Sequence, residues 1–207
     1  MLPLKVSLFL VIFCTHGASV RETGKKKDDN PIDKIASVAG FDPSKFAGKW
    51  YLLSVASECD YLKTNNHRVE ATTIQATQSK NWRDEDILAI STHRKLDGIC
   101  WEIKHEYKMD TKVKGRFSFK VGGYGGDAQV VVAATDYQNY AILYYQRRKK
   151  ITIKLYGRKP SASDDVSQIL DDRVTKQGFD LEYIYWFPTY GFCETADQFH
   201  ILNEVPR

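Results

Sequence analysis

The hydrophobic residues between positions 48 and 156 fall into short runs separated by polar or glycine-containing turns. Several runs alternate apolar and polar side chains, which is the pattern of a strand with one buried face. The alternation is clearest at 113–121, where Phe117, Phe119 and Val121 would share one face. We expect eight strands, at 50–56, 70–77, 87–92, 101–107, 113–121, 128–134, 140–146 and 151–156.

The connections between these runs are short and rich in turn residues, with no long helix among them. Examples are the stretch at 95–98, the glycine-rich GGYGGD at 122–127 and the basic turn Arg147–Lys150. Even spacing with hairpin turns indicates an antiparallel meander, which forms a sandwich or an up-and-down barrel. An eight-stranded barrel can hold one small ligand in its interior. We interpret the basic turn as solvated, with docking of an acidic partner as the functional alternative.

The segment 163–177 follows the last of these strands and has helical periodicity. Its apolar residues recur at i, i+3, i+4 and i+8, and Gly178 suits the end of a helix. These residues predict an amphipathic helix packed outside the barrel, followed by a short added strand at 183–187. The expected buried stripe consists of Val166, Ile169, Leu170 and Val174.

The first 19 residues have the pattern of a secretory signal peptide. Lys5 is followed by an apolar run of about nine residues and then by small residues, and this run is far shorter than the ~20 residues that a membrane span needs. We expect a signal peptide at 1–19, a flexible and charged arm at 20–38, and one folded domain at 39–207. The protein should therefore be secreted and should not insert into a bilayer.

The composition is that of an ordinary globular protein. The chain has 207 residues, of which 43% are hydrophobic and 27% charged, and its formal net charge is +4. These values exclude a disordered chain and a membrane protein with many spans. The excess positive charge is small and spread along the chain, so it does not indicate a nucleic-acid partner.

The four cysteines become informative once the signal peptide is set aside. Its removal takes Cys14 away and leaves Cys59, Cys100 and Cys193. An odd count in an oxidising compartment suggests one internal disulfide and one thiol with another fate. Cys59 lies between Glu58 and Asp60, so we expect it to be exposed and not a tuned nucleophile.

Three short motifs occur in one order along the predicted meander. Gly48 and Trp50 open the first strand, Thr135-Asp136-Tyr137 ends the sixth, and Arg158 follows the eighth. With the helix that follows, this arrangement resembles a lipocalin. The resemblance implies that Trp50 lies at the closed end of the barrel and that Arg158 stacks across it. These residues would be structural, since a guanidinium over an indole gains cation–π energy.

Further segments, such as HRVEATTI at 67–74 and YGFCETADQFHIL at 190–202, resemble the branch of this family that is found in the complement system. The resemblance implies a disulfide between Cys100 and Cys193 that attaches the tail to the barrel wall. It also implies a disulfide from Cys59 to the alpha subunit of the eighth complement component. That component's beta subunit and the membrane attack complex would then be indirect partners.

Two other functions compete with this one. The protein could be a plasma carrier of a small hydrophobic ligand, whose calyx (the barrel interior) would be lined by Tyr107, Phe117, Phe119 and Tyr156. An enzyme is disfavoured, because the histidines are scattered and form neither metal-ligand spacing nor a Ser/His/Asp group. We therefore expect no catalytic residue, no metal and no cofactor.

Overall fold

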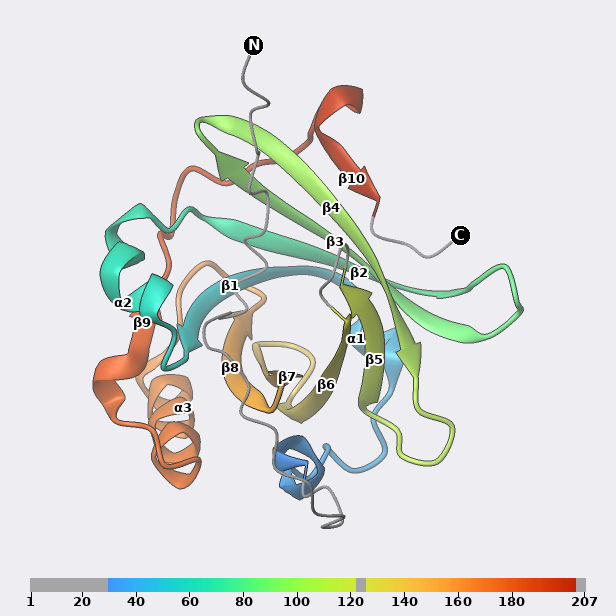
Figure 1. Ribbon diagram of the computed structural model, residues 1–207, viewed down its shortest axis with the longest axis horizontal. Coiled ribbons are helices and arrows are strands. Elements are labelled where there is room, and N and C mark those ends of the chain that lie inside the picture. The colour runs from blue at the N-terminus through green and yellow to red at the C-terminus, as the bar shows by residue number, and fades with distance from the viewer. Residues whose placement is uncertain (1–29, 122–125, 204–207) are drawn as a thin grey trace, which may run out of the picture.

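The computed structural model describes residues 30–121 and 126–203. It confirms the predicted eight-stranded antiparallel up-and-down barrel with a helix outside it (Figure 1). Neighbouring strands pair in the order β4-β3-β2-β1-β8-β7-β6-β5, and pairing between β4 and β5 closes the barrel. The strands are β1 (Gly48–Ala56), β2 (Thr72–Lys80), β3 (Asp86–Leu96), β4 (Ile99–Met109), β5 (Arg116–Val121), β6 (Gly126–Thr135), β7 (Tyr140–Arg147) and β8 (Lys150–Gly157).

The two ends of the barrel differ. At the closed end, helix α1 (Pro43–Phe46) leads into β1, and the turns after β2, β4 and β6 lie at this end. The opposite end, which we call the mouth, carries helix α2 (Asp60–Asn65) after β1 and the tight turns β3–β4 and β7–β8. The β7–β8 turn places both Arg148 and Lys149 at positive φ, as a two-residue hairpin of this kind requires.

The barrel wall is completed by short strands from the C-terminal tail. Strands β4 and β5 pair at Lys108↔Ser118 and Met109↔Phe117, near the closed end. Closer to the mouth, β10 (Ile201–Asn203) pairs in parallel with β4. Strand β9 (Ile184–Trp186) pairs antiparallel with the mouth end of β1. The tail is therefore part of the wall.

Apolar residues form two layers, one inside the barrel and one outside it. The outer layer lies under helix α3 (Asp164–Lys176), whose Val166, Leu170 and Val174 are buried against outward-facing residues of β1, β7 and β8. The side chain of Ser163 accepts a hydrogen bond from the backbone N–H of Val166 and so caps the helix. Gly178 follows the helix with a φ of 86°. The predicted helix is thus confirmed, with Ile169 only partly buried.

The prediction was wrong about the start of the fifth strand. Residues 110–115 form a turn, and β5 begins at Arg116 and not at 113. The carboxylate of Asp110 accepts hydrogen bonds from the backbone N–H groups of Lys112 and Val113, at 2.7 and 2.9 Å. This local bonding competes with a strand ladder.

Residues 30–38 were expected to belong to a flexible arm, but they pack on the barrel. The side chain of Ile32 is fully buried in the outer layer. Its N–H donates to Oε1 of Gln146 at 2.8 Å, and the N–H of Val38 donates to the carbonyl of Val132 at 2.9 Å. The rest of the predicted arm, the predicted signal peptide and residues 122–125 lie outside the described residues.

Candidate functional site

The closed end is built around a stack of two side chains. The Cζ atom of Arg158 lies 3.7 Å from the centroid of the Trp50 ring. The same guanidinium donates to the carbonyls of Lys49 and Ala47, both at 2.9 Å, and to that of Tyr137 at 3.1 Å. The indole N–H of Trp50 donates to the carbonyl of Phe46 at 2.8 Å. These contacts join β1, β8 and two turns into one floor.

The turn between β6 and β7 completes this floor. One carboxylate oxygen of Asp136 accepts the N–H groups of Gln138, Asn139 and Tyr140, at 2.8–3.1 Å. Burial raises the pKa of Asp136, but these backbone hydrogen bonds outweigh it and the pKa is lowered. Tyr137 has a φ of 63°, and its hydroxyl accepts the N–H of Asp42 at 2.9 Å. The side-chain hydroxyl of Thr135 donates a hydrogen bond to the carbonyl of Tyr140 in the same turn, at 2.7 Å. All of these contacts are structural.

The expected calyx residues all lie on the inner face of the barrel. Tyr107, Phe117, Phe119 and Tyr156 belong to one inner cluster, in which the rings of Tyr107 and Phe119 stack at 4.5 Å. Tyr107, Phe119 and Tyr156 line a cavity, whereas Phe117 lies closer to the closed end, against Phe41. The inner face thus combines these aromatic rings with aliphatic side chains.

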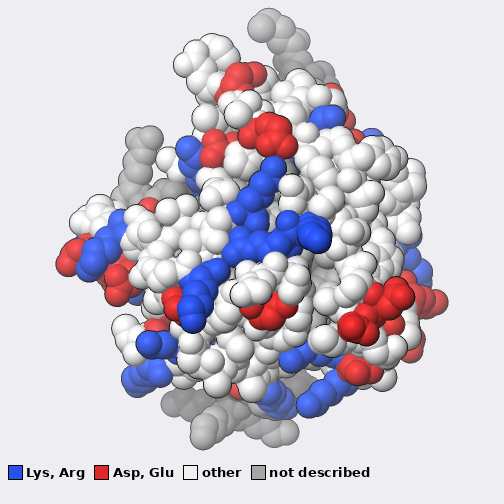
Figure 2. Space-filling view, turned by 180° about the vertical axis from the view of Figure 1, so that it is seen from behind, with Lys and Arg blue, Asp and Glu red and all other residues white. Residues whose placement is uncertain are grey.

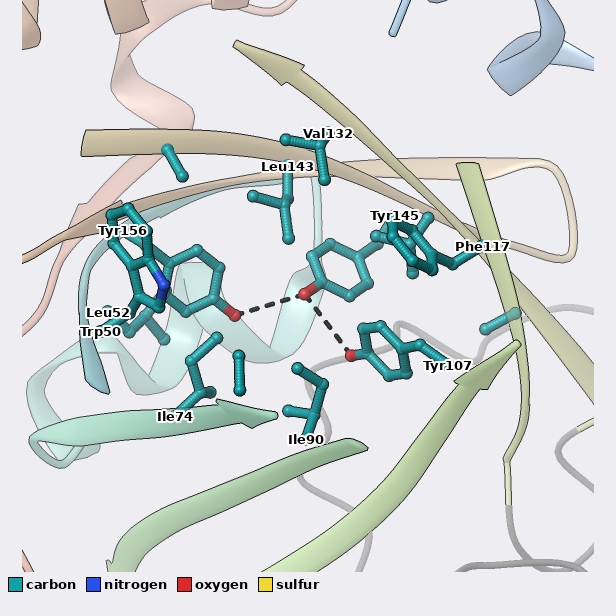
Figure 3. Packing of buried hydrophobic residues seen from close by; sticks show 14 of the residues in the cluster. Trp50, Leu52, Ile74, Ile90, Tyr107, Phe117, Val132, Leu143, Tyr145 and Tyr156 are labelled. Atoms are coloured by element: carbon teal, nitrogen blue, oxygen red, sulfur yellow. Dashed lines mark hydrogen bonds between the residues drawn. The ribbon is translucent and has the colours of Figure 1, made fainter. Parts of the chain in front are cut away.

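Three tyrosine hydroxyls meet inside the barrel (Figure 3). Tyr107 donates to Tyr145 at 3.5 Å, and the hydroxyls of Tyr145 and Tyr156 lie 3.4 Å apart. Burial raises the pKa of Tyr156 to about 12, and it raises those of Tyr107 and Tyr145 further above their usual range. The three hydroxyls therefore stay protonated at physiological pH and can act as donors.

Two cationic side chains also line this cavity. Lys154 comes from β8 and Arg94 from β3, and His105 of β4 also lines the cavity. The Nζ atom of Lys154 lies 4.3 Å from the centroid of the Tyr145 ring. Burial, together with the nearby charge of Arg94, lowers the pKa of Lys154 to about 8. Burial also lowers the pKa of Arg94, although Tyr61 and Glu70 near the mouth oppose this.

The cavity between these groups is small, with a volume of about 50 Å³. At about 30 Å³ per water molecule, that volume holds about two of them. Its remaining lining is apolar or bears hydroxyl groups, and it includes Leu52, Thr72, Ile74, Thr92, Ile103 and Phe187. A ligand as large as a benzene ring requires side chains to move, since a cavity that binds benzene has a volume of about 150 Å³.

The two cations, Arg94 and Lys154, were not among the expected calyx residues, because charged residues of an alternating strand are usually expected to face the solvent. In β8, Ile153 and Leu155 face outward and are covered by α3, while Lys154 and Tyr156 face inward. A strand with an exposed outer face would have the opposite arrangement. The expected placement of Tyr156 in the calyx already implied that Lys154 faces inward, since both lie on the same face of β8. The helix that follows β8 agrees, because its apolar stripe needs apolar residues on the outside of the barrel.

Cys100 and Cys193 are joined by a disulfide with an S–S distance of 2.12 Å. Cys100 lies at the start of β4 and Cys193 in the tail between β9 and β10. The bond therefore holds the tail where its last strand adds to β4. An ion pair between Lys49 and Glu194, at 3.1 Å, attaches the neighbouring part of the tail to β1.

Cys59 lies at the mouth, directly before α2, but the expectation that it is exposed was wrong. Its side chain is 2% exposed, because it packs into the inner cluster with the fully buried Leu62. Its sulfur is disulfide-bonded, and the partner is not among the described residues. Beside it lies a surface hollow of about 290 Å³ that is lined by Glu58 and by Arg147, Lys149 and Lys150 of the basic turn.

The charges on the surface are mixed. On the face opposite to that of Figure 1, lysine and arginine side chains form a short central band with acidic side chains around it (Figure 2). Nucleic-acid-binding proteins instead present an extended basic stripe. Within the described residues no cluster of three metal-ligating side chains occurs, and no helix is long and apolar enough to cross a membrane.

Comparison with known proteins agrees with this geometry. The model of the lipocalin / cytosolic fatty-acid binding protein family matches residues 47–188. The chain belongs to the lipocalin family. Its likeness to the complement component C8 gamma chain of Oryctolagus cuniculus extends over 202 residues at 43% identity, covering 97% of both chains.

Two further relatives have lower sequence identity to this chain. Protein AMBP of Bos taurus is 26% identical over 180 residues, which is 84% of this chain but 50% of that protein, so the lipocalin spans about half of it. The solved structure of the siderocalin Ex-FABP, described as functioning through dual ligand specificities, superposes with a TM-score of 0.62 at 20% identity. It covers 74% of this chain and 96% of its own, and it shows a shared fold.

Proposed function

We propose that this lipocalin is a secreted plasma subunit of the eighth complement component. It would be disulfide-linked through Cys59 to the alpha subunit, associated through that subunit with the beta subunit, and carried into the membrane attack complex without inserting into the bilayer itself. The observation that carries the proposal is the 43% identity to a C8 gamma chain over nearly the whole of both proteins. The lipocalin fold supplies a calyx, and we propose a binding role for it and not a catalytic one.

The position of Cys59 supports the covalent link. The chain has four cysteines, and the bond between Cys100 and Cys193 accounts for two of them. Cleavage of the predicted signal peptide would remove Cys14, so a bonded Cys59 would then need a partner from another chain. Cys59 lies at the mouth directly before α2, where an approaching chain would have to displace the packing that buries the sulfur.

The surroundings of Cys59 favour a protein segment as the partner. The adjacent hollow of about 290 Å³ is much larger than the inner cavity, and cations from the β7–β8 turn line it. Such a surface suits an acidic or neutral segment, which could cross the mouth and reach into the calyx. The Cys59 disulfide would raise the effective concentration of that segment at the mouth.

Electrophoresis of the plasma protein with and without reductant tests this proposal. We expect one larger species that releases a chain of this size on reduction, and mass mapping should place Cys59 in the cross-link. In co-expression with the alpha chain, Cys59→Ser should abolish the larger species. Lys63→Ser, four residues along the same segment, is the control and should leave it intact. A lone monomer under both conditions would overturn the covalent link.

The alternative is a plasma small-molecule carrier similar to alpha-one-microglobulin. The stacked rings of Tyr107 and Phe119 favour it, because aromatic walls bind flat ligands. Quenching of the buried Trp50 by a retinoid or a bilin would distinguish the two functions. Tight binding by the uncomplexed chain supports the carrier, and the small cavity predicts that such binding is weak.

A further inference from the structure

One tryptophan on the outside of the barrel has an exposed ring. Trp82 lies in the turn between β2 and β3, which projects at the right of Figure 1, and it is 68% exposed. The guanidinium of Arg83 covers one face of the indole, with its Cζ atom 4.4 Å from the ring centroid. So much exposure leaves the opposite face open to solvent. A single exposed ring is common and is not by itself a site, but this one borders a hollow.

The turn holds Trp82 in a fixed position. The side-chain oxygen of Asn81 accepts the backbone N–H groups of Arg83 and Glu85, at 2.9 and 3.0 Å. The side-chain nitrogen of Asn81 donates to one carboxylate oxygen of Glu85 at 2.9 Å, and Lys108 of β4 forms an ion pair with the other oxygen. The turn is therefore bonded both to itself and to the barrel wall. A ring that is already held in place loses little entropy when a ligand binds to it.

The hollow beside Trp82 lies on the outer surface of the barrel and has a volume of about 270 Å³. Its lining combines the turn with outward-facing residues of β4 and β5, such as Lys108, Ser118 and Lys120. Among the described residues it shares only Phe119 with the inner cavity, and it shares none with the hollow beside Cys59. It is therefore a separate cavity, and its size is close to the lower end for small-ligand pockets, about 300 Å³.

The charges around this outer hollow balance. Among the described residues that line it, three are cationic and three are acidic: Arg83, Lys108, Lys120, Glu85, Glu106 and Asp127. Lys108 pairs with Glu85, and Lys120 pairs with Asp127 at 2.9 Å. With no net charge to attract an anion or a cation, the lining favours an uncharged ligand. The same groups place donors and acceptors close together, so that ligand should carry several hydrogen-bonding groups.

An uncharged sugar ring has both of the properties that these walls favour. One face of a pyranose consists of C–H groups that can lie against an indole, and its edge carries hydroxyls that both donate and accept. The open face of Trp82 suits the C–H face, and the carboxylates of Glu85 and Glu106 suit the hydroxyl protons. Hydrogen bonds from Lys108 and Asn81 lower the pKa of Glu85, so this carboxylate remains an acceptor at physiological pH.

We propose that the outer hollow binds an uncharged pyranose sugar, which stacks on Trp82 and forms hydrogen bonds with the charged side chains around it. The site is independent of the complement role proposed above. Because it shares no lining residue with the hollow beside Cys59, sugar binding and a covalent partner would not compete.

A nuclear magnetic resonance titration of the isotope-labelled full chain tests the proposal. The probes are methyl β-galactoside, methyl α-mannoside and N-acetylglucosamine. Each tryptophan gives its own indole N–H signal, and the signal that disappears in Trp82→Phe belongs to Trp82. We expect at least one sugar to shift this signal and the backbone amides of residues 81–85 saturably, with a Kd on the order of 1 mM. The indole signals of Trp50 and Trp186 should not move.

Variants at exposed tryptophans separate stacking from a general effect on the fold. Trp82→Ala should abolish sugar binding, and Trp82→Tyr should keep it because a tyrosine also offers a flat ring. Trp186→Ala is the matched control, since Trp186 is 50% exposed in β9 and does not line the hollow. It should leave the affinity unchanged. No saturable shift with any of the three sugars, or binding that survives in Trp82→Ala, would overturn the proposal.

The sulfated form of whichever sugar binds tests the charge balance. We expect it to bind no more tightly than the uncharged sugar, and the affinity of the uncharged sugar should not depend on salt. A preference for the sulfated form that salt abolishes would mean that the hollow is an anion site, contrary to the proposal. If no sugar binds and Trp82→Ala instead weakens assembly with the alpha subunit, the turn is a protein contact. Neither result depends on Cys59, so both are separate from failure of the covalent link.

Discussion

The guanidinium of Arg158 lies flat over the indole of Trp50, with its Cζ atom 3.7 Å from the ring centroid. The pair joins the start of the first barrel strand to the end of the last one. The guanidinium also donates to five backbone carbonyls at the closed end, those of Lys45, Phe46, Ala47, Lys49 and Tyr137. One side chain therefore supplies hydrogen bonds to several backbone carbonyls at this end of the barrel.

Replacing Arg158 by Met should destabilise the fold strongly. The variant keeps much of the apolar stem but loses the cation–π contact and leaves buried carbonyls without donors, each of which costs about 1–3 kcal/mol. We expect the free energy of unfolding in urea to fall by about 3–5 kcal/mol. Lys159→Met, at the exposed neighbouring position, should change it by less than about 0.5 kcal/mol. If the two variants lost similar amounts of unfolding free energy, the stack of Arg158 on Trp50 would not be what stabilises the closed end.

Removing the disulfide with a Cys100→Ser/Cys193→Ser double variant should also destabilise the protein. The sequence separation is 93 residues, and loop-closure entropy for such a loop corresponds to about 4–5 kcal/mol. We expect that loss in chemical denaturation, with hydrogen exchange at Ile201–Asn203 accelerating most, because the bond holds β10 beside β4. Unchanged exchange in β10 would mean that strand pairing alone attaches the tail.

Stability should rise with pH between about pH 8 and 10 because of Lys154. Burial lowers its pKa to about 8 from 10.5, so in this window the unfolded chain holds a proton that the folded chain has released. The penalty is fully present below pH 8. Above pH 10 the trend should reverse, because the buried tyrosines keep protons that the unfolded chain loses.

Lys154→Met isolates this effect. At pH 7 the variant should be more stable than the wild type, by up to about 3 kcal/mol from a shift of this size. The difference should shrink as the pH rises to 10.5, which thermal denaturation across the range would measure. Lys150→Met serves as the control and should follow the wild-type curve. A constant advantage for Lys154→Met at every pH would mean that packing, and not charge, explains it.

Most of the barrel could be predicted from the alternation of apolar and polar residues. Where this prediction failed, the failure has a physical cause. Alternation correctly placed Phe117 and Phe119 on one face of β5, because one face of this strand is apolar and the other is polar. It could not orient β8, where Ile153 is covered by a helix and Lys154 faces a cavity, because periodicity alone does not show which face is the interior. The family resemblance, not periodicity, pointed to the closed-end stack.

The remaining errors concern contacts between distant parts of the chain. Polar neighbours suggested that Cys59 is exposed, but a short helix folds Leu62 inward and buries the sulfur with it. The sparse apolar residues at 30–38 suggested a free arm, but Ile32 fits a gap in the outer layer. Strand β10 was missed because three residues carry too little pattern, and it exists through pairing with β4.

Substitution of Gly48 by Ala should also destabilise the closed end of the barrel, because Gly48 lies against the guanidinium of Arg158. Gly48 has a φ of 102°, a conformation that side chains rarely adopt, and an added Cβ would lie 3.1 Å from Nη1 of Arg158. We expect a loss of about 2–3 kcal/mol in the free energy of unfolding, from backbone strain and displacement of the guanidinium.

Gly98→Ala is the matched control, because Gly98 has a φ of 80° but no atom within 4 Å of the added Cβ. It should lose about 1 kcal/mol, the cost of the backbone conformation alone. The excess loss at Gly48 should disappear when Arg158 is already Met, because the contact is then gone. A double-mutant cycle in urea measures this coupling. Additive losses would show that Gly48 is required only for its backbone conformation and not for the close approach of Arg158.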